Sequence, residues 1–243
     1  MPPVSAKSML RPFVSRRVEQ TVRRSVARPL ARSLNALAFV YGSDKRTQNY
    51  VPAYTRHMSG RRRHVSKVLE IGVGGYTNPN VGGASLRMWR SYFPNAEVIG
   101  IDIVPKVIDE PRIRFIQCDQ SSRDQLEQIA ALGPYDVIID DGSHIQQHVV
   151  LTFETLYPVL NPGGVYVIED LATAYTESTG GGPPGTEGTG LSIARMLLDE
   201  VNREGIPNAD LVLDEQYCDV GAIHAYASLL FVERRGGSDP ALR

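Results

Sequence analysis

The sequence predicts an α/β fold in which a mostly parallel, doubly wound sheet of seven strands is covered by helices on both faces. Three observations support this fold class. Short apolar segments of strand length alternate with helical segments through the middle of the chain, which is the pattern of βαβ units. The segments 135–140 and 164–169 are apolar almost throughout, as parallel strands buried on both faces are. Near the end, two β-rich segments with almost nothing between them predict an antiparallel hairpin at the sheet edge.

The elements follow one another in a consistent order. We expect strands at 67–71, 97–103, 113–117, 135–140, 164–169, 220–226 and 229–233, and helices at 84–93, 123–132 and about 145–160. The ends of parallel strands open on one edge of such a sheet, and ligands bind at that edge.

Length and composition fit one full-sized globular domain with a small appendage. The chain has 243 residues, of which 42% are hydrophobic and 22% are charged. No apolar segment approaches the length of a membrane span, and the N-terminus lacks the apolar core of a signal peptide, so we expect a cytoplasmic protein. Cys118 and Cys218 lie far apart without a metal-ligand partner in sequence, and we expect both to be buried thiols.

The charge is distributed unevenly along the chain. Residues 1–67 contain 15 lysines and arginines against 2 acidic residues, whereas the remainder contains 11 against 25. We expect residues 1–40 to form a basic helical arm, residues 41–235 the main domain and residues 236–243 a disordered tail.

Apolar residues recur at every fourth position of the arm. They are Leu10, Val14, Val18, Val22, Val26, Leu30 and Leu34. This spacing predicts a helix that buries an apolar stripe. We expect the stripe to pack on the acidic domain or on a second subunit, which would give a homo-oligomer through the arm. An anionic membrane surface or a polyanion is the alternative, and nucleic acid is not the expected partner.

Acidic residues follow two of the predicted buried strands directly. Asp140 and Asp141 end one strand, with His144 three residues further on, and Glu169 and Asp170 end the next strand. A right-handed connection makes such strands neighbours, so four carboxylates and one imidazole converge at one edge of the sheet. Carboxylate oxygens are the ligands that hard divalent cations take, and the pattern therefore predicts a Mg²⁺ site beside a histidine. A helix cap is the alternative role for one member of the aspartate pair.

A glycine-rich turn after the first strand predicts a cofactor site. Gly72 and Gly74 leave room for a ligand to approach the backbone. Asp102 ends the second strand, where a carboxylate accepts hydrogen bonds from ribose hydroxyls, and Asp119 is placed to meet an adenine amino group. NAD and S-adenosylmethionine suit this pattern equally, but Thr77 stands where the dinucleotide motif has its third glycine. Turn or cap chemistry is an even alternative for each aspartate.

The segment 171–190 interrupts the alternation of strands and helices. Its Gly, Thr and Pro residues cannot build a core, and it begins directly after the second acidic pair. An active-site lid is favoured over an inert linker. Tyr175 in this lid and His224 on the terminal hairpin are candidates for contact with an acceptor substrate, and for His224 an ordinary strand position is an equal alternative.

Taken together, these residues resemble a known family. The order of Glu70, Gly72, Gly74, Asp102, Asp119 and the Asp140-Asp141 pair is similar to class I S-adenosylmethionine-dependent methyltransferases. More specifically, the metal-dependent sugar O-methyltransferases resemble this chain in Tyr41-Gly42-Ser43-Asp44-Lys45 with Tyr50 and Tyr54, in Gly74-Gly75-Tyr76-Thr77-Asn78-Pro79, in Gly82-Gly83-Ala84-Ser85-Leu86-Arg87-Met88-Trp89, in Asp140-Asp141-Gly142-Ser143-His144 and in Ile168-Glu169-Asp170. The group includes the macrocin and mycinamicin enzymes and relatives that act on methylmannose polysaccharides. The similarity runs from about residue 39 to residue 233.

The resemblance implies an enzyme with a Rossmann-like methyltransferase fold that methylates a sugar hydroxyl. In the family, the last acid of the aspartate pair and both acids after the following strand hold Mg²⁺ or Mn²⁺, which correspond to Asp141, Glu169 and Asp170. The family's base corresponds to His144, which acts beside Asp141. The expected cofactor-binding residues are Glu70, Gly72, Gly74, Asp102, Asp119, Tyr41, Ser43 and Asp140. The acceptor is expected to be an oligosaccharide, a polysaccharide precursor or a glycosylated natural product.

The sequence departs from the macrolide enzymes in two places. Those enzymes carry a large N-terminal domain where a short basic arm precedes Tyr41 here, and their lid sequence is not reproduced, so neither their assembly nor their acceptor is carried over. A Mg²⁺-dependent catechol-type methyltransferase is an alternative that would favour aromatic walls. An NAD-dependent oxidoreductase would be expected to have the third glycine, and a non-catalytic adenosyl-ligand binding module has no use for the metal acids.

Overall fold

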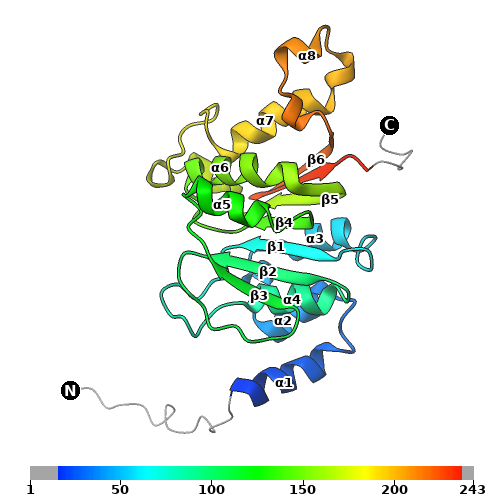
Figure 1. Ribbon diagram of the computed structural model, residues 1–243, viewed down its shortest axis with the longest axis vertical. Coiled ribbons are helices and arrows are strands. Elements are labelled where there is room, and N and C mark those ends of the chain that lie inside the picture. The colour runs from blue at the N-terminus through cyan, green and yellow to red at the C-terminus, as the bar shows by residue number, and fades with distance from the viewer. Residues whose placement is uncertain (1–15, 237–243) are drawn as a thin grey trace, which may run out of the picture.

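The alternating apolar segments form one seven-stranded sheet with the strand order β3-β2-β1-β4-β5-β7-β6 (Figure 1). The structure is a computed structural model that describes residues 16–236. The strands are β1 (Lys67–Ile71), β2 (Glu97–Asp102), β3 (Ile113–Gln117), β4 (Tyr135–Asp140), β5 (Leu160–Ile168), β6 (Val220–Tyr226) and β7 (Leu229–Arg234). Strands β1 to β5 are parallel, and β7 runs antiparallel to both β5 and β6. The predicted fold class is therefore confirmed, including the hairpin at the edge.

The helices fill the connections between the strands. They are α1 (Arg16–Ala27), α2 (Leu34–Tyr41), α3 (Val51–Met58), α4 (Ala84–Tyr92), α5 (Arg123–Ala130), α6 (Gln146–Leu156), α7 (Gly190–Val201) and α8 (Ala209–Val212). Helix α6 ends earlier than predicted, and a 3₁₀ turn at Tyr157–Val159 leads into β5. Pro158 in that turn has no N–H with which to continue the helical hydrogen bonds of α6. Strand β5 therefore begins at Leu160, ahead of its predicted start at 164.

Two hydrophobic cores lie on opposite faces of the sheet. Successive side chains of a strand point to opposite faces, and β4 shows the consequence. Val137 and Ile139 pack into the core formed with α2, α3 and α4, whereas Ile138 packs into the core formed with α5, α6 and α7. All three side chains are fully buried. The continuous apolar strands of the sequence are thus explained by a sheet that has helices on both faces.

The arm is not the single helix that the four-residue spacing predicts. Helix α1 ends at Ala27, and α2 begins at Leu34 after Ser33, whose side chain accepts a hydrogen bond from the backbone N–H of Ala36. This serine cap starts a new helix and breaks the stripe. Leu10 and Val14 of the predicted stripe lie outside the described residues, as does the predicted tail from residue 237 onward.

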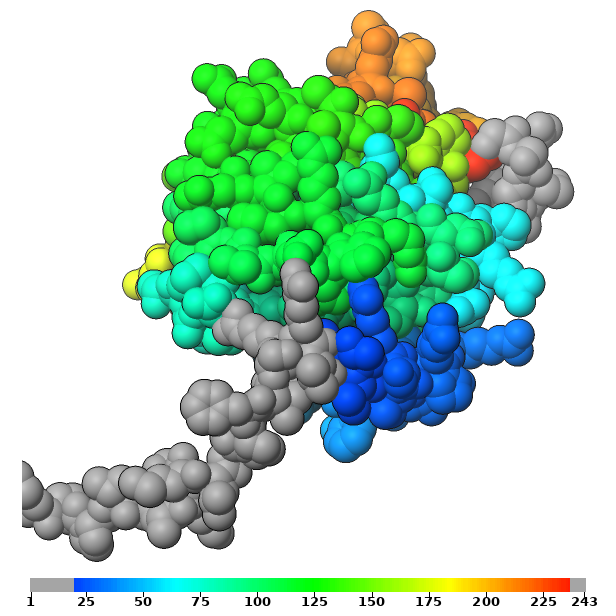
Figure 2. All heavy atoms as spheres, turned by 60° about the horizontal axis from the view of Figure 1, so that its bottom comes forward, coloured from blue at the N-terminus to red at the C-terminus, as the bar shows by residue number. Residues whose placement is uncertain are grey.

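Two apolar residues of α1 are exposed rather than buried. Val22 and Val26 are 56% and 49% exposed, so the predicted burial is wrong for these two residues within a single chain. The helix is held by Ala27, which is buried in the core, and by polar contacts: the Arg23 guanidinium donates to the carbonyl oxygens of Val40 and Tyr41, both at 3.2 Å. Figure 2 shows α1, in dark blue, on the outside of the domain.

The structure also tests the predicted burial of the two cysteines and the expectation that the chain has no membrane span. Cys118 is buried, but Cys218 is exposed, so the prediction of a second buried thiol is wrong. Cys218 follows a surface 3₁₀ turn in which Tyr217 is the residue that turns inward. Both cysteines are free thiols. Within residues 16–236, no helix is both long enough and apolar enough to cross a membrane.

We predict that Phe153→Ala strongly destabilises the fold. Phe153 is fully buried on α6 and lies 5.0 Å from the ring of Tyr166 and 5.2 Å from that of Tyr157, centroid to centroid. The cavity left by alanine should cost about 3–5 kcal/mol of unfolding free energy. The matched control is Phe39→Ala, because Phe39 is 71% exposed, with Arg46 over its ring, and it should cost less than about 1 kcal/mol. Equal losses in urea denaturation would contradict the assigned core.

Candidate active site

The carboxyl ends of β1, β4 and β5 meet at one edge of the sheet. Asp140 is in register with Ile71 on one side and with Ile168 on the other. The chain remains paired just beyond these strands, since the N–H of Glu169 donates to the carbonyl of Asp140 at 2.9 Å. The predicted neighbours are confirmed, and the acidic pairs that follow β4 and β5 leave the sheet side by side.

Lys45 lies at the centre of these acids. Its ammonium nitrogen is 2.8 Å from Asp141 Oδ2, 2.7 Å from Glu169 Oε1 and 3.1 Å from Glu70 Oε1, and its side chain is 1% exposed. Burial by itself lowers the pKa of Lys45, but the three carboxylates outweigh it and hold the pKa well above the ordinary lysine value. Lys45 is part of the motif that carries the family resemblance, but its contacts to these acids were not predicted.

A tight turn places Lys45 in the interior. Helix α2 ends at Tyr41 and is capped by Gly42, which adopts the left-handed conformation with φ 71° and donates to carbonyls of the last turn. A 3₁₀ turn at Asp44–Arg46 follows, and the chain then enters α3. The lysine thus lies between two helices that pack on the same face of the sheet, and its aliphatic stem is buried with them.

Glu169 faces Lys45 rather than the solvent. It is 4% exposed, and its Oε1 accepts hydrogen bonds from Lys45 and from the hydroxyl of Tyr54. Burial raises the pKa of Glu169 above its ordinary value, Lys45 acts against this shift, and Asp141 adds to it. Among the described residues, the second oxygen, Oε2, accepts no hydrogen bond, so it remains available to a cation.

Asp141, Asp170 and His144 form a more open group. One ligand atom from each residue lies within 4.8 Å of the others. His144 Nε2 is 3.4 Å from Asp170 Oδ2, and the hydroxyl of Tyr50 donates to Asp170 Oδ1 at 2.6 Å. Two carboxylates and an imidazole are a donor set that suits a divalent cation. The structure therefore brings together two of the three predicted metal ligands with the predicted base, and turns Glu169 towards Lys45.

The backbone at two of these residues is unusual. His144 has φ 58° and Asp170 has φ 49°, in the left-handed region that side chains other than glycine seldom adopt. Such strain is typical of functional sites. His144 precedes α6 instead of lying in its first turn, and its side chain is 30% exposed. His144 is therefore not a surface residue of that helix.

Asp140 points away from the metal acids. It is 2% exposed, and its carboxylate accepts hydrogen bonds from Gln120 Nε2 at 2.8 Å and from the N–H of Gly142 at 3.3 Å. Burial raises the pKa of Asp140 to about 7. The residue before α6 is Ile145, and α6 has no side-chain cap, so neither aspartate of the pair caps this helix. Cofactor contact by Asp140 stays a prediction.

A cleft of about 970 Å³ opens beside the glycine turn. Its lining includes Tyr41, Asp44, Gly72, Gly74, Ser85, Asp141 and, from α1, Gln20 and Arg24. This volume lies at the upper end of the range for small-molecule sites. Gly74 has φ 68°, and a side chain built there would meet nothing within 4 Å, so the turn presents bare backbone to the cleft. The glycine turn therefore leaves its backbone open to a ligand in the cleft.

Two residues of the Tyr41–Lys45 motif add polar groups near the cleft. The Tyr41 hydroxyl lies 2.8 Å from Ser91 Oγ. The Ser43 hydroxyl is buried and has no hydrogen-bond partner among the described residues. An unpaired buried hydroxyl is costly, and a ligand that pairs with it removes that cost. The carboxylate of Glu70 is also buried, and Ser85 and Lys45 contact it.

The other two predicted cofactor residues hold their own turns. Asp102 accepts hydrogen bonds from the N–H groups of Val73 and Val104 at 3.1 and 2.9 Å. Asp119 accepts from the backbone and the hydroxyl of Ser121, and these hydrogen bonds lower its pKa. Both therefore have the turn chemistry that was their alternative role, and neither lines the 970 Å³ cleft. Their contact with ribose and adenine remains a prediction.

The two candidates for acceptor contact lie in different places. Tyr175 ends a 3₁₀ turn at the start of the predicted lid and is 53% exposed. His224 lies on β6, and its imidazole faces His57 and Glu233 instead of the acids at the strand ends. The structure therefore places His224 in a separate group of side chains, whereas Tyr175 remains a candidate.

Comparison with known proteins finds several methyltransferases that are similar to this chain. A family model described as a methyltransferase domain matches residues 80–171. The mycinamicin VI 2''-O-methyltransferase of Micromonospora griseorubida is 44% identical over 191 residues, which cover 76% of this chain and 48% of that protein. The demethylmacrocin O-methyltransferase of Streptomyces fradiae is 40% identical over 196 residues, covering 78% of this chain and 49% of that protein.

A solved structure agrees with these relatives. The MycE methyltransferase from the mycinamycin biosynthetic pathway, in complex with Mg, SAH and mycinamycin VI, aligns with a TM-score of 0.78 and 39% identity over 86% of this chain and 56% of that chain. The chain spans about half the length of the curated relatives that it matches. The methyltransferase fold and the family resemblance predicted from the sequence are confirmed.

We predict that Lys45→Met destabilises the protein because the buried carboxylates of Glu70 and Glu169 and the partly exposed carboxylate of Asp141 lose their cation. Removing one partner of a buried ion pair should cost about 3–5 kcal/mol in urea denaturation. Adding Glu169→Gln to Lys45→Met should recover part of the loss, since one buried charge is then removed. The control Lys67→Met removes a lysine whose ammonium donates to the Leu132 carbonyl at 2.8 Å, and it should cost only about 1 kcal/mol. A double variant no more stable than Lys45→Met would refute the charge explanation.

Proposed function

We propose that this chain, which carries a methyltransferase domain and whose close homologues are sugar O-methyltransferases, transfers a methyl group from S-adenosylmethionine to a sugar hydroxyl. The observation that carries the proposal is the group of Asp141, Asp170 and His144 directly beside the glycine-turn cleft. Relatives named above methylate sugars on natural products, and none of them is named for a polysaccharide. A glycosylated natural product is therefore the proposed acceptor.

The cofactor and the metal are assigned to separate parts of the site. We place S-adenosylmethionine against Gly72 and Gly74 and beside Tyr41, which line the 970 Å³ cleft. Further polar contacts are proposed from residues outside this lining, namely Ser43, Glu70, Asp102, Asp119 and Asp140. We assign Mg²⁺ to Asp141, Asp170 and the free oxygen of Glu169. When bound, a divalent cation supplies the positive charge that lowers the pKa of a hydroxyl.

Lys45 holds two of the proposed metal ligands in place. It binds one oxygen of Asp141 and one of Glu169, which leaves the other oxygen of each carboxylate for the cation. Its charge also offsets part of the repulsion that three neighbouring acids would otherwise produce before a metal arrives. Tyr50 acts in the same way on Asp170 by donating to Oδ1, so each ligand acid is oriented by a donor from the segment 45–54.

His144 is the proposed base. A sugar hydroxyl is almost entirely protonated at neutral pH, and an imidazole is the side chain best suited to accept a proton in this range. Its left-handed backbone brings Nε2 to 3.4 Å from Asp170 Oδ2, so proton removal takes place beside the metal ligands. The comparisons give no support to the catechol-type enzyme or the binding module.

We also propose the bounds of the domain and of the lid, and the compartment of the protein. We assign residues 41–235 to the methyltransferase domain and residues 171–190 to a lid, because its two ends are anchored at Leu171 and Thr189, which are 6% and 1% exposed. The free cysteines are compatible with the cytoplasm, which keeps thiols reduced.

We also propose that the chain forms a homo-oligomer through the arm. The exposed Val22 and Val26 offer an apolar strip on α1 to a second copy of the chain. Light scattering should then report an oligomer in the wild type and a monomer in Val22→Asp/Val26→Asp. A wild-type monomer would remove the proposal.

We predict that chelation abolishes methyl transfer and that Mg²⁺ or Mn²⁺ restores it. The assay follows label from S-adenosylmethionine into a panel of glycosylated natural products and oligosaccharides by mass spectrometry. Asp170→Asn should lose activity because a metal ligand is weakened, whereas Asp210→Asn should keep it, since that side chain is 87% exposed on α8. Calorimetry should show binding of S-adenosylhomocysteine and none of NAD. Full turnover in chelator after exhaustive dialysis would overturn the metal assignment.

We predict that His144→Ala lowers turnover by roughly 10²–10⁴-fold with little change in cofactor affinity, which is the usual contribution of a positioned base. The comparison variant is His148→Ala, because His148 lies on α6 with its ring nitrogen 2.9 Å from Ser143 Oγ and outside the Asp141 group. Single-turnover rates measured against pH should lose their ascending limb in His144→Ala alone. If His144→Ala keeps that limb while His148→Ala loses it, the base has been assigned to the wrong histidine.

A further inference from the structure

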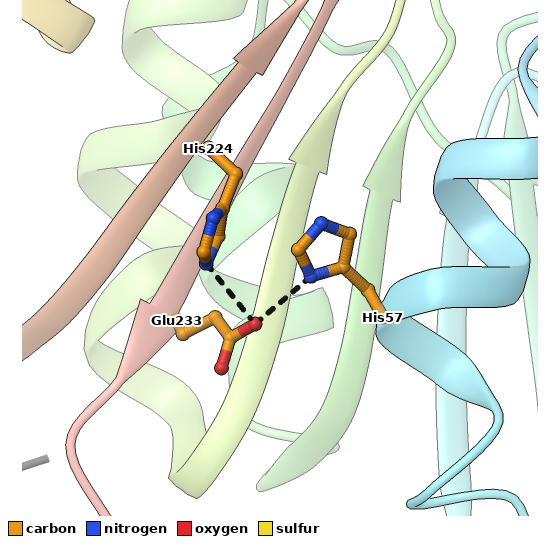
Figure 3. A group of neighbouring side chains, drawn as sticks. All are labelled: His57, His224 and Glu233. Atoms are coloured by element: carbon orange, nitrogen blue, oxygen red, sulfur yellow. Dashed lines mark hydrogen bonds and ion pairs between the residues drawn. The ribbon is translucent and has the colours of Figure 1, made fainter. Parts of the chain in front are cut away.

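A second group of metal-ligating side chains lies on the face of the sheet that α3 covers. His57 belongs to the last turn of α3, His224 to β6 and Glu233 to β7, and Figure 3 shows the three side chains converging from these elements. His57 and Glu233 are separated by 176 residues in sequence. We propose that these three residues form a binding site for a transition-metal ion, of which Zn²⁺ is the best match, that ties α3 to the C-terminal hairpin.

The ligand atoms have the spacing of a tetrahedral site. His57 Nδ1 is 3.1 Å from Glu233 Oε1, His224 Nε2 is 3.6 Å from the same oxygen, and all three atoms lie within 4.8 Å of one another. Two ligands bound to zinc at about 2.1 Å in tetrahedral geometry lie about 3.4 Å apart. The two observed distances bracket this value, so a metal ion fits between the ligands with small shifts of the side chains.

Neighbouring groups prepare His57 and Glu233 for this role. His57 Nε2 is 3.0 Å from the Tyr226 hydroxyl, and when Nε2 donates to it, Nδ1 keeps the lone pair that a metal needs. Without a metal, the 3.1 Å between Nδ1 and Glu233 Oε1 is the length of a hydrogen bond that the imidazole donates. A metal ion held by both atoms takes the place of that proton once Nε2 carries the ring N–H. Arg61 donates to Glu233 Oε2 at 3.1 Å, which fixes the carboxylate and leaves Oε1 to the metal.

Burial and ring contacts make the site ordered but accessible. The His57 side chain is 5% exposed and stacks on the ring of Phe231 at a centroid distance of 4.3 Å. The His224 side chain is 39% exposed and forms the outer wall. A metal ion therefore reaches the group from the His224 side, and the open side leaves room for water as a fourth ligand.

The donor atoms of this site differ from those of the strand-end site, which is the group of Asp141, Asp170 and His144. Two imidazoles and one carboxylate favour zinc and similar metals, whereas the oxygen-rich Asp141 group favours Mg²⁺. The positive charges of Arg56 and Arg61 lie nearby and weaken the binding of any divalent ion. They weaken it most for an ion such as Mg²⁺, which is held mainly by electrostatic attraction. A metal that bonds strongly to imidazole nitrogen is therefore the occupant that the site selects.

The expected role of this ion is structural. Helix α3 also carries Tyr54, which donates to Glu169, and it starts directly after Tyr50, which donates to Asp170. Tying the helix to β6 and β7 holds both tyrosines against the strand-end acids. Zinc should therefore raise thermal stability by binding the folded state, without a direct part in the reaction.

The test is calorimetric titration of the metal-free full chain with Zn²⁺ in excess Mg²⁺, so that the carboxylate site is already occupied. The wild type should bind one Zn²⁺ per chain and gain thermal stability. Loss of a ligand in His224→Gln or Glu233→Gln should weaken binding by at least about 100-fold, and loss of the supporting hydroxyl in Tyr226→Phe should weaken it by about 10-fold. Circular dichroism verifies that each variant is folded. The His224 side chain is 39% exposed, so His224→Gln keeps the test valid if Glu233→Gln does not fold.

Two matched variants decide between this site and the alternatives. His64→Gln changes an exposed histidine outside the group, and it should bind Zn²⁺ as the wild type does. Asp170→Asn alters the strand-end group and should also leave this binding intact. Zn²⁺ affinity that survives in His224→Gln and Glu233→Gln, or that is lost only in Asp170→Asn, would overturn the proposal, as would a wild type that takes up no Zn²⁺ in the presence of Mg²⁺.

Discussion

The buried ammonium of Lys45 is the interaction on which the strand-end site depends. Acids at the ends of β1, β4 and β5 are drawn together by the register of the parallel strands, and Glu70 and Glu169 are removed from water as well. Such a group cannot be held ionised without a compensating charge. Lys45 supplies it from within, and this requirement explains the short turn between α2 and α3 that carries the lysine into the interior.

Helix α3 links this electrostatic centre to the far edge of the sheet. Tyr50 and Tyr54 reach the acids from the beginning of the helix, and His57 reaches β6 and β7 from its end. A displacement of this one element would therefore disturb the orientation of both Glu169 and Asp170. The hairpin contributes to the active site indirectly, because it packs against the helix that orients the ligand acids and does not place a side chain among them.

The sequence predicts features that depend on neighbouring residues, such as strands and the acids at their ends. It does not predict contacts between residues that are far apart in the chain. Alternating apolar segments locate the strands, and the acids at their ends follow from sheet geometry. Lys45 and Glu169 are 124 residues apart, and nothing in the pattern around either one reveals that they pair. The four-residue spacing of the arm fails for a different reason, since the cap at Ser33 and the arginine contacts of α1 override an apolar period.

In helix α1 of the arm, two charged side chains face the domain and two apolar side chains face outward. Arg23 faces inward and satisfies carbonyl oxygens that α2 leaves unpaired at its end, and Arg24 and Gln20 line the cleft beside the glycine turn. Val22 and Val26 face outward. Arg23 thus contacts the domain itself, and Arg24 lies at the proposed cofactor cleft. A polyanion is not required to explain them, and the apolar side is the part of the arm that a second protein surface would cover.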